Sequence, residues 1–314
     1  MDLDLTSDQV ALEEAVGKAL ARHDGDALLG ELDAAGYLDV VRDAGPIEGV
    51  LVVERAAEAL AVGPIAARVL VGPLAGVPDL PPAVGLVAGP SAALCRWAPE
   101  CEAFLVLDGD RALLAGRGDV DVVPVESAFG ASYGTVTVRR ADEVASGDRL
   151  RRAWQVAIAA EAEGTMLAAI AKTAQYVGQR HQFGRPIGGF QAVQHRLATA
   201  YAMAMGTRWL ARRAAWYVDD EFLTASAAAY GCEAAQVTYT NTHQVTGAIG
   251  ITSEYGLVGW TTRLLGLRQE LGGQRAHARR VTATRRAMDK AWPSPLPLPS
   301  LSPRSRGDQL EELG

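Results

Sequence analysis

The sequence predicts a mostly helical fold with a small β domain in the middle of the chain. Residues 6–72 and the stretch from 150 to 289 carry apolar residues at helical spacing, whereas the region between them has short β-like runs separated by Gly, Pro and Asp. The C-terminal stretch contains four or more long, nearly uncharged helical segments, which indicates an antiparallel four-helix bundle. We expect an N-terminal helical domain at 1–72, a reduced β domain at 73–145 and a C-terminal helical bundle at 146–291.

The N-terminal helices are predicted from one capping signal and three glycine breaks. Thr6 and Gln9 have the spacing of a capping box, in which each side chain bonds the other residue's backbone N–H at the start of a helix. Gly25, Gly36 and Gly45 interrupt the helical pattern that follows. In the β region, the predicted strands are residues 84–87, 103–107, 112–114, 120–125 and 135–138.

Two long helical patterns in the C-terminal half are joined by a Gly/Pro-rich turn at 184–189. The segment from Arg180 to Gln191, which contains this turn, holds a cation, an aromatic ring and an amide close together at a helix junction, which suits a flat anionic ligand such as a nucleotide diphosphate. The alternative is an ordinary interhelical turn with a surface Arg and a core Phe. Further helix breaks are expected at 219–221 and at 247–250, and we expect the Pro/Ser-rich tail at 292–314 to be disordered.

Composition narrows the class of protein. The hydrophobic content of 49% and the formal net charge of −7 favour neither a disordered chain nor a nucleic-acid partner. No run of about 18 uncharged apolar residues predicts a membrane span. Cys95, Cys101 and Cys232 fit a reducing compartment and have no metal-ligand spacing with the five histidines. We expect a cytoplasmic protein without a metal site.

Several separated motifs of the C-terminal half agree with one known family in order and spacing. They are Gly164, Tyr176, Arg180-His-Gln-Phe-Gly-Arg-Pro-Ile187, Phe190-Gln191, Gln244-Val-Thr-Gly-Ala-Ile-Gly250 and Glu254-Tyr255. With these motifs the chain resembles the acyl-CoA dehydrogenase family, flavoproteins that oxidise acyl-CoA thioesters to enoyl-CoA. The resemblance covers about residues 2–288 and is weak between 75 and 145.

The resemblance implies that the recognised turn binds the ADP half of an FAD held mainly by a neighbouring subunit. Arg180 would neutralise the pyrophosphate, Phe183 would contact the adenine end, and Gly247 would let the backbone approach the phosphates. The implied pocket also contains Gln182, Gln191, Gln244 and Ala248. Ala248 replaces the second Gly of the family motif. For the Gln244–Gly247 segment alone, a capped helix end is the alternative.

Other parts of the family's site are missing from the sequence. Family members hold the flavin ring with a Thr-Glu-Pro-like loop and a Trp-x-Thr/Ser motif, but Trp97 is not followed by a hydroxyl residue. Leu271 occupies the commonest position of the catalytic Glu and Trp154 occupies the alternative one, and neither accepts a proton. Glu270 lies one residue away, where it could act as base or stabilise the helix start near Gln274. Glu161 is interpreted as a solvent or interface carboxylate.

These absences favour a subunit that does not catalyse alone. The chain is similar to the short subunit of actinobacterial α2β2 acyl-CoA dehydrogenases that act on steroid side-chain CoA thioesters, in which a longer partner supplies the base and the ring-binding domain. The implied partners are that longer subunit, an acyl-CoA substrate and an electron-transferring flavoprotein. Two alternatives stay open: a homomeric acyl-CoA dehydrogenase with Glu270 as base, and a flavin-free assembly or scaffold protein.

Overall fold

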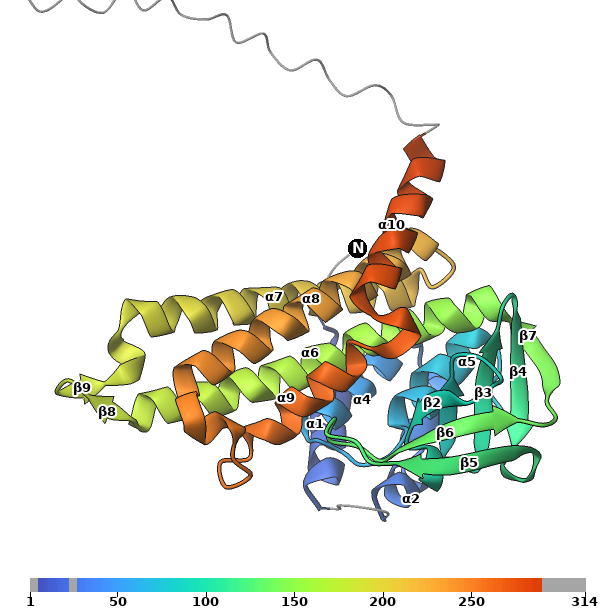
Figure 1. Ribbon diagram of the computed structural model, residues 1–314, viewed down its shortest axis with the longest axis horizontal. Coiled ribbons are helices and arrows are strands. Elements are labelled where there is room, and N and C mark those ends of the chain that lie inside the picture. The colour runs from blue at the N-terminus through green and yellow to red at the C-terminus, as the bar shows by residue number, and fades with distance from the viewer. Residues whose placement is uncertain (1–4, 23–26, 290–314) are drawn as a thin grey trace, which may run out of the picture.

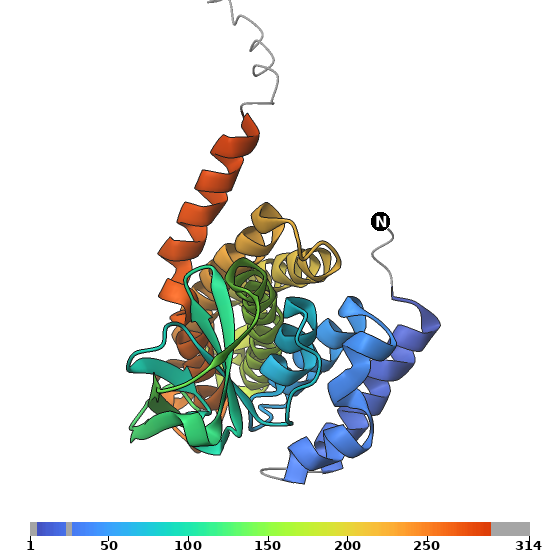
Figure 2. The ribbon, with the colours of Figure 1, turned by 90° about the vertical axis from the view of Figure 1, so that its right-hand side faces the viewer.

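The computed structural model describes residues 5–22 and 27–289, and within them the fold is mostly helical with a small β region, as predicted. Long helices form an elongated bundle, the strands lie at one end of it, and the N-terminal helices pack along its side (Figure 1). The view along the bundle in Figure 2 shows the strands in front and the N-terminal helices to one side. The exact domain boundaries stay predictions, and both Gly25 and the expected disordered tail lie outside the described residues.

The N-terminal helices begin at the predicted capping box. Gln9 N–H donates to Thr6 Oγ1 at 3.2 Å, and Thr6 N–H donates to Gln9 Oε1 at 3.0 Å. The predicted breaks are confirmed at Gly36 and Gly45, whose φ angles of 77° and 145° favour glycine. The α-helices are α1 (Ser7–Arg22), α2 (Ala27–Ala34), α3 (Val40–Asp43), α4 (Pro46–Glu58) and α5 (Gly72–Ala75), with helical turns at η1 (Tyr37–Asp39) and η2 (Ala67–Val71).

The β region contains two small sheets. Their strands are β1 (Val84–Val87), β2 (Ala93–Arg96), β3 (Ala103–Asp108), β4 (Arg111–Gly116), β5 (Val120–Val125), β6 (Tyr133–Val138) and β7 (Asp142–Ser146). One sheet has the order β1-β3-β4-β7, with β1 and β3 parallel, and the other has the order β2-β6-β5. The five predicted strand segments are confirmed. The sequence reading missed β2 and β7; β7 reads as Asp-Glu-Val-Ala-Ser and forms a mostly exposed sheet edge.

The C-terminal half consists of helices that run back and forth, with α6 at the centre (Figure 1). They are α6 (Gly147–Gln179), α7 (Gln191–Trp216), α8 (Glu221–Thr246), α9 (Leu257–Leu267) and α10 (Gly273–Asp289). α6 is buried around most of its circumference because it contacts α4, α7, α8 and α9. A Cβ added at Gly164 would lie 2.1 Å from the carbonyl oxygen of Glu54, so glycine permits the close approach of α4 and α6.

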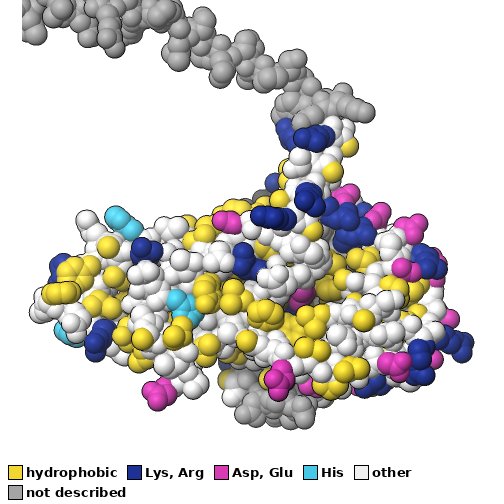
Figure 3. Space-filling model, viewed as in Figure 1, with side chains coloured by type: hydrophobic (Ala, Val, Ile, Leu, Met, Phe, Trp, Pro, Cys, Tyr) yellow, Lys and Arg dark blue, Asp and Glu magenta, His cyan; other side chains and the backbone are white. Residues whose placement is uncertain are grey.

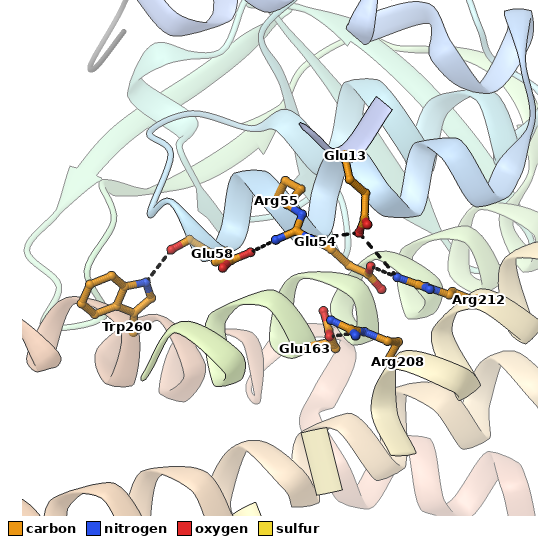
Figure 4. Close-up of polar contacts among 8 residues, drawn as sticks. All are labelled: Glu13, Glu54, Arg55, Glu58, Glu163, Arg208, Arg212 and Trp260. Atoms are coloured by element: carbon orange, nitrogen blue, oxygen red, sulfur yellow. Dashed lines mark hydrogen bonds and ion pairs between the residues drawn. The ribbon is translucent and has the colours of Figure 1, made fainter. Parts of the chain in front are cut away.

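A buried charge network joins the N-terminal helices to the bundle (Figure 4). Arg212 of α7 pairs with Glu54 of α4 at 2.8 Å, and Arg208 pairs with Glu163 of α6 at 2.7 Å. Glu13 of α1 lies 3.9 Å from Arg212. Burial raises the pKa of both Glu54 and Glu163, against the lowering effect of the arginines. The two helical parts are thus held together by charges that depend on one another.

The described helices include none that combines the length and the apolar character needed to cross a bilayer. Across the same residues, His, Cys, Asp and Glu side chains form no group of three or more arranged to hold a metal ion. Cys95, Cys101 and Cys232 are buried and free. Burial raises the pKa of the Cys95 and Cys232 thiols to about 12, so they are unreactive at neutral pH.

Candidate functional site

The predicted nucleotide-binding turn is a short hairpin at the free end of the bundle (Figure 1). It consists of β8 (His181–Gln182) and β9 (Arg185–Pro186), followed by the helical turn η5 (Ile187–Gly189). Ile187 N–H donates to the carbonyl of Arg180 at 2.8 Å and closes the hairpin against the end of α6. Gln182 is exposed on β8, and Gln191 is exposed as the first residue of α7.

Phe183 is held outward at the tip of this hairpin. Its side chain is 91% exposed and its backbone has a φ of 53°, which is unfavourable for a residue other than glycine. The ring stands edge-on to Phe190 at 6.1 Å, and the Arg185 guanidinium lies 4.0 Å from the Phe190 ring centre. Figure 3 shows hydrophobic side chains gathered at this tip. The alternative interpretation of Phe183 as a core residue is therefore wrong.

The second predicted segment follows α8 and lies at the same end of the bundle (Figure 1). Gln244, Gly247 and Ala248 are all exposed there, in the last turn of α8 and in η6 (Gly247–Ile251). Gly247 has φ 64° and ψ −147°, a conformation that requires glycine. The Tyr255 ring, beyond this segment, lies 5.3 Å from the Tyr176 ring of α6.

The Tyr255 hydroxyl also donates to the carbonyl of Lys172 on α6. These contacts attach the loop after α8 to α6 one to two turns before Arg180. The two predicted parts of the pocket are thereby brought to one end of the bundle.

The residues at this end fit the ADP half of an FAD. The Arg180 side chain makes no hydrogen bond or ion pair with any part of the chain that the structure describes. An exposed, unpaired guanidinium is suited to a pyrophosphate. The glycine conformation at Gly247 leaves its backbone uncovered, since an added Cβ would meet no atom within 4 Å. A free cation, an exposed aromatic ring and open backbone are the groups that a nucleotide diphosphate needs.

A second site lies where the β region meets the bundle. A cavity of about 270 Å³ opens between β2, β6, α6 and the segment that joins α9 to α10. Its walls are mostly apolar, and four polar residues form a network there: Arg96, Trp154, Glu161 and Glu270. The segment that carries Glu270 is tightly bent, because Leu271, Gly272 and Gly273 all have positive φ angles.

The network engages both oxygens of the Glu270 carboxylate. Arg96 Nε donates to Glu270 Oε1 at 3.0 Å, and Trp154 Nε1 donates to Glu270 Oε2 at 2.6 Å. The remaining guanidinium nitrogens of Arg96 donate to Glu161 at 2.7 and 2.9 Å. Two sequence expectations are therefore corrected: Glu161 is buried and paired instead of facing solvent, and Glu270 bonds Arg96 and Trp154 instead of the start of α10.

The charges of this network depend on one another. Burial raises the pKa of Glu270, while Arg96 and the hydrogen bond from Trp154 lower it. Burial opposes the charge on Arg96, but Glu161 and Glu270 outweigh it and raise the pKa of Arg96 well above its ordinary value. The guanidinium is thus a fixed cation shared by two carboxylates. Each oxygen of the Glu270 carboxylate already accepts one hydrogen bond from within the chain, and the adjacent Arg96 cation lowers its affinity for a proton from a ligand.

Sequence reasoning examined the two possible base positions separately and missed Arg96. The structure places Trp154, at the alternative base position, directly against Glu270. Arg96 belongs to β2, 174 residues from Glu270 in the sequence, and no local pattern indicated that they pair. The sequence does show an Arg next to Trp97, but no known motif or residue spacing connects that Arg to Glu270.

Comparison with known proteins finds a family match for the C-terminal region of the chain. Residues 154–287 match the acyl-CoA dehydrogenase C-terminal domain. The C-terminal region of the chain is thus similar to the acyl-CoA dehydrogenase family. Acyl-CoA dehydrogenase FadE34 of Mycobacterium tuberculosis is 34% identical over 148 residues, which are 45% of this chain and 21% of that protein. Acyl-CoA dehydrogenase IpdE2 of Mycolicibacterium smegmatis is 33% identical over 132 residues, 40% of each chain. The matches thus span less than half of these relatives.

Several solved structures share the fold over nearly the whole chain. The ChsE4-ChsE5 complex from Mycobacterium tuberculosis contains a chain with a TM-score of 0.75 and 22% identity, covering 94% of this protein and 100% of that chain. The Tcur3481-Tcur3483 steroid ACAD variant gives a TM-score of 0.76 at 20% identity, with coverage of 91% and 99%. PigA, solved as a complex with FAD, shares the fold with a TM-score of 0.72 at 16% identity.

Proposed function

We propose that this protein is an acyl-CoA dehydrogenase family member and a subunit of a heteromeric, FAD-dependent enzyme. It contributes the ADP-side FAD pocket to a longer partner subunit and does not catalyse alone. The reaction is α,β-dehydrogenation of an acyl-CoA thioester, with a steroid side-chain CoA as the substrate class. The complex acts in the cytoplasm and passes electrons to an electron-transferring flavoprotein.

One observation carries the proposal: both carboxylate oxygens of Glu270 are held inside the chain by Arg96 and Trp154. An acyl-CoA dehydrogenase needs a carboxylate free to take the α-proton of the thioester. Releasing Glu270 would leave Arg96 with one partner and the Trp154 indole without any. The chain therefore stabilises an arrangement in which its nearest candidate base is occupied.

The bundle end supports the binding role. Arg180 is unpaired, Phe183 is held outward, and Gly247 exposes its backbone at the same end of the molecule. In the proposed complex, Arg180 neutralises the pyrophosphate, Phe183 contacts the adenine end, and Gln191 and Gln244 donate hydrogen bonds; Gln182 and Ala248 line the same pocket. Bound FAD supplies the two-electron acceptor for the dehydrogenation. The likeness to the ChsE4-ChsE5 and Tcur3481-Tcur3483 assemblies supports both the heteromeric state and the steroid substrate class.

A homomeric enzyme with Glu270 as base is the second candidate, and one observation favours it. Burial raises the pKa of Glu270, which is a common property of catalytic carboxylates. That reading requires the ligand to displace Arg96 or Trp154 from the carboxylate. It also requires a flavin ring to bind beside a β region in which Trp97 lacks the following hydroxyl.

Flavin stoichiometry tests the proposal. We expect the chain expressed alone to be colourless or poorly soluble, and the chain co-expressed with a longer acyl-CoA dehydrogenase from the same genome to give a yellow complex with one FAD per heterodimer. Absorbance spectra and quantitative amino-acid analysis of the purified material measure this ratio. A stable yellow homo-oligomer with one FAD per chain would establish the homomeric reading. A flavin-free complex would instead establish the scaffold alternative.

A further inference from the structure

Helix α10 carries a concentration of positive charge that neither the fold nor the proposed FAD site uses. Residues 271–288 contain five arginines and no acidic residue, although the whole chain has a formal charge of −7. The rest of the chain therefore carries a formal charge of −12. The outer part of α10 stands clear of the bundle (Figures 1 and 2), and Figure 3 shows dark blue side chains along it.

One side of α10 is fixed to the rest of the molecule. Arg280 pairs with Glu221 of α8 at 2.9 Å, and Gln274 donates to Glu233 of the same helix. His277 is only 1% exposed, and its Nδ1 lies 3.2 Å from Gln155 Nε2 of α6. These contacts determine which face of α10 points away from the bundle.

The outward face is a basic stripe formed by Arg275, Arg279 and Arg286. All three are exposed, and none of them makes an ion pair or a hydrogen bond with residues in the described ranges 5–22 and 27–289. Ala278, Thr282 and Ala283 lie between them and form the floor of a shallow groove. At 1.5 Å per residue the stripe is about 16 Å long. Like charges one turn apart, as at Arg275 and Arg279, disfavour the helix when nothing compensates them.

We propose that this basic stripe docks an acidic helical face of the longer partner subunit. The inference rests on the proposed heteromeric function and adds to it a contact remote from the FAD site. Arginine suits such a contact because its planar guanidinium binds carboxylates through two parallel hydrogen bonds. Arg275 and Arg279 are about one helical turn apart, and Arg279 and Arg286 are about two turns apart. A partner helix with three carboxylates at the same spacing would match the three guanidinium groups.

Other occupants fit less well. A membrane surface needs bulky apolar anchors beside the cations, whereas small Ala and Thr side chains separate these arginines. A nucleic acid would meet a molecule whose remaining residues carry a formal charge of −12. A free nucleotide would need an enclosed site, and this groove is shallow and lined by one helix alone.

Charge reversal in the co-expressed complex tests the inference. We expect Arg279→Glu/Arg286→Glu to weaken association with the longer subunit by at least about tenfold, measured from the dissociation of the purified co-expressed complex on dilution in 50 mM NaCl, followed by analytical ultracentrifugation. Raising the salt concentration should weaken the wild-type complex and reduce the difference in affinity between the wild-type and charge-reversed complexes. Arg279→Lys/Arg286→Lys keeps the charge and should lose much less affinity. The matched control is Arg117→Glu/Arg140→Glu, which makes the same charge change at exposed positions of the β region.

A stability measurement separates docking from a structural role. Glu at position 279 relieves the repulsion from Arg275, so the reversed chain alone should melt at the same temperature as wild type or higher. Unchanged affinity in a complex that does form would overturn the inference and leave the proposed function standing. A wild-type chain that forms no complex at all would overturn both. Loss of self-association alone on reversal would identify a second copy as the occupant and also overturn the inference.

Discussion

Two charged residues with opposite surroundings support the proposed division of labour. Arg180 is exposed and has no partner among the described residues, so its charge is available to a ligand. Glu270 is largely buried, and both of its oxygens accept hydrogen bonds from within the chain. A charge left unpaired at a surface is inexpensive to keep, whereas a buried one needs its partners. The chain therefore has a cation ready for binding and a carboxylate committed to structure.

Removing the Arg180 charge should weaken FAD binding. Arg180→Ala deletes a charge-assisted contact of about 1.5 to 3 kcal/mol, so FAD retention by the co-expressed complex should fall by roughly ten- to hundredfold. Flavin fluorescence during dialysis against decreasing FAD concentrations gives the dissociation constant. Arg117→Ala, at an exposed position of the β region, is the control. Unchanged affinity for FAD would mean that Arg180 is an ordinary cation at the end of a helix.

Glu270→Gln separates structure from catalysis. The Gln side chain has one oxygen and one NH2 group in place of the two carboxylate oxygens. Either Arg96 or Trp154 would therefore face the NH2 group, donor against donor, so the melting temperature of the complex should fall. Turnover per bound flavin should change by less than about threefold, whereas a lost general base costs on the order of a hundredfold or more. Steady-state assays at a temperature where both complexes stay folded measure this. A collapse of kcat would favour the homomeric enzyme.

At the scale of single residues, the sequence predicted which residues belong to the candidate site better than it predicted what those residues contact. It pointed to Glu270 as the nearest carboxylate to the missing base, but it placed Glu161 in solvent. The reason is physical: the pairing of Glu161 and Glu270 depends on Arg96, which arrives from a strand far away in the sequence. Local spacing predicts which residues share a helix face, and it contains no information about a partner from another domain.

At the scale of secondary-structure elements, close packing of α4 on α6 brings the buried carboxylates of Glu54 and Glu163 near each other. Periodicity predicted the long helices and their breaks because one face of each is apolar and glycines interrupt them. The short strands β2 and β7 escaped prediction, since four or five residues at a sheet edge leave little alternation to detect. The predicted turn between the two long helices is confirmed, but its hairpin geometry depends on the positive φ at Phe183, which no residue preference predicts.

Two glycines on α6 make a matched test of this packing. Gly164→Ala would place a Cβ 2.1 Å from the backbone oxygen of Glu54, so α4 and α6 must separate, and we expect a loss of about 3 kcal/mol in unfolding free energy. Gly178→Ala has no atom within 4 Å of the added Cβ and should be neutral or stabilise by up to about 1 kcal/mol. Urea unfolding followed by circular dichroism measures both. Equal effects would show that the helices are not in tight contact.

At the scale of the whole molecule, one hydrophobic core is shared by the N-terminal helices, the N-terminal part of α6, parts of α7 and α8 and a few strand residues. A second core lies within the β region around Phe104 and Val136, and a third lies in the bundle around Met166 and Leu264. The charge network of Figure 4 lies at the junction of α1, α4, α6 and α7. It therefore stabilises the packing of these helices against one another. Breaking it should therefore affect global unfolding, and the effect should depend on pH.

Arg212→Met tests this through the pH dependence of stability. Burial already raises the pKa of Glu54 above its ordinary value of 4.5, and loss of Arg212, the largest lowering influence, would raise it further. Between 4.5 and that raised pKa the folded state binds more protons than the unfolded state, so the variant's stability falls as pH rises through this window. Below the window Glu54 is protonated in both states, and the cost of its buried charge disappears.

We therefore expect Arg212→Met to lose about 3 to 5 kcal/mol of unfolding free energy at pH 8 and distinctly less at pH 5. Adding Glu54→Gln to this variant removes the titrating carboxyl group, so the stability difference from wild type should depend much less on pH. Glu163 keeps a smaller pH dependence through its own raised pKa. Arg213→Met, at the exposed neighbouring position, is the matched control and should be nearly neutral at both pH values. Urea unfolding at the two pH values measures all four chains. A loss that is the same at pH 5 and pH 8 would mean that Arg212 acts through packing on Trp209 and not by holding the charge of Glu54.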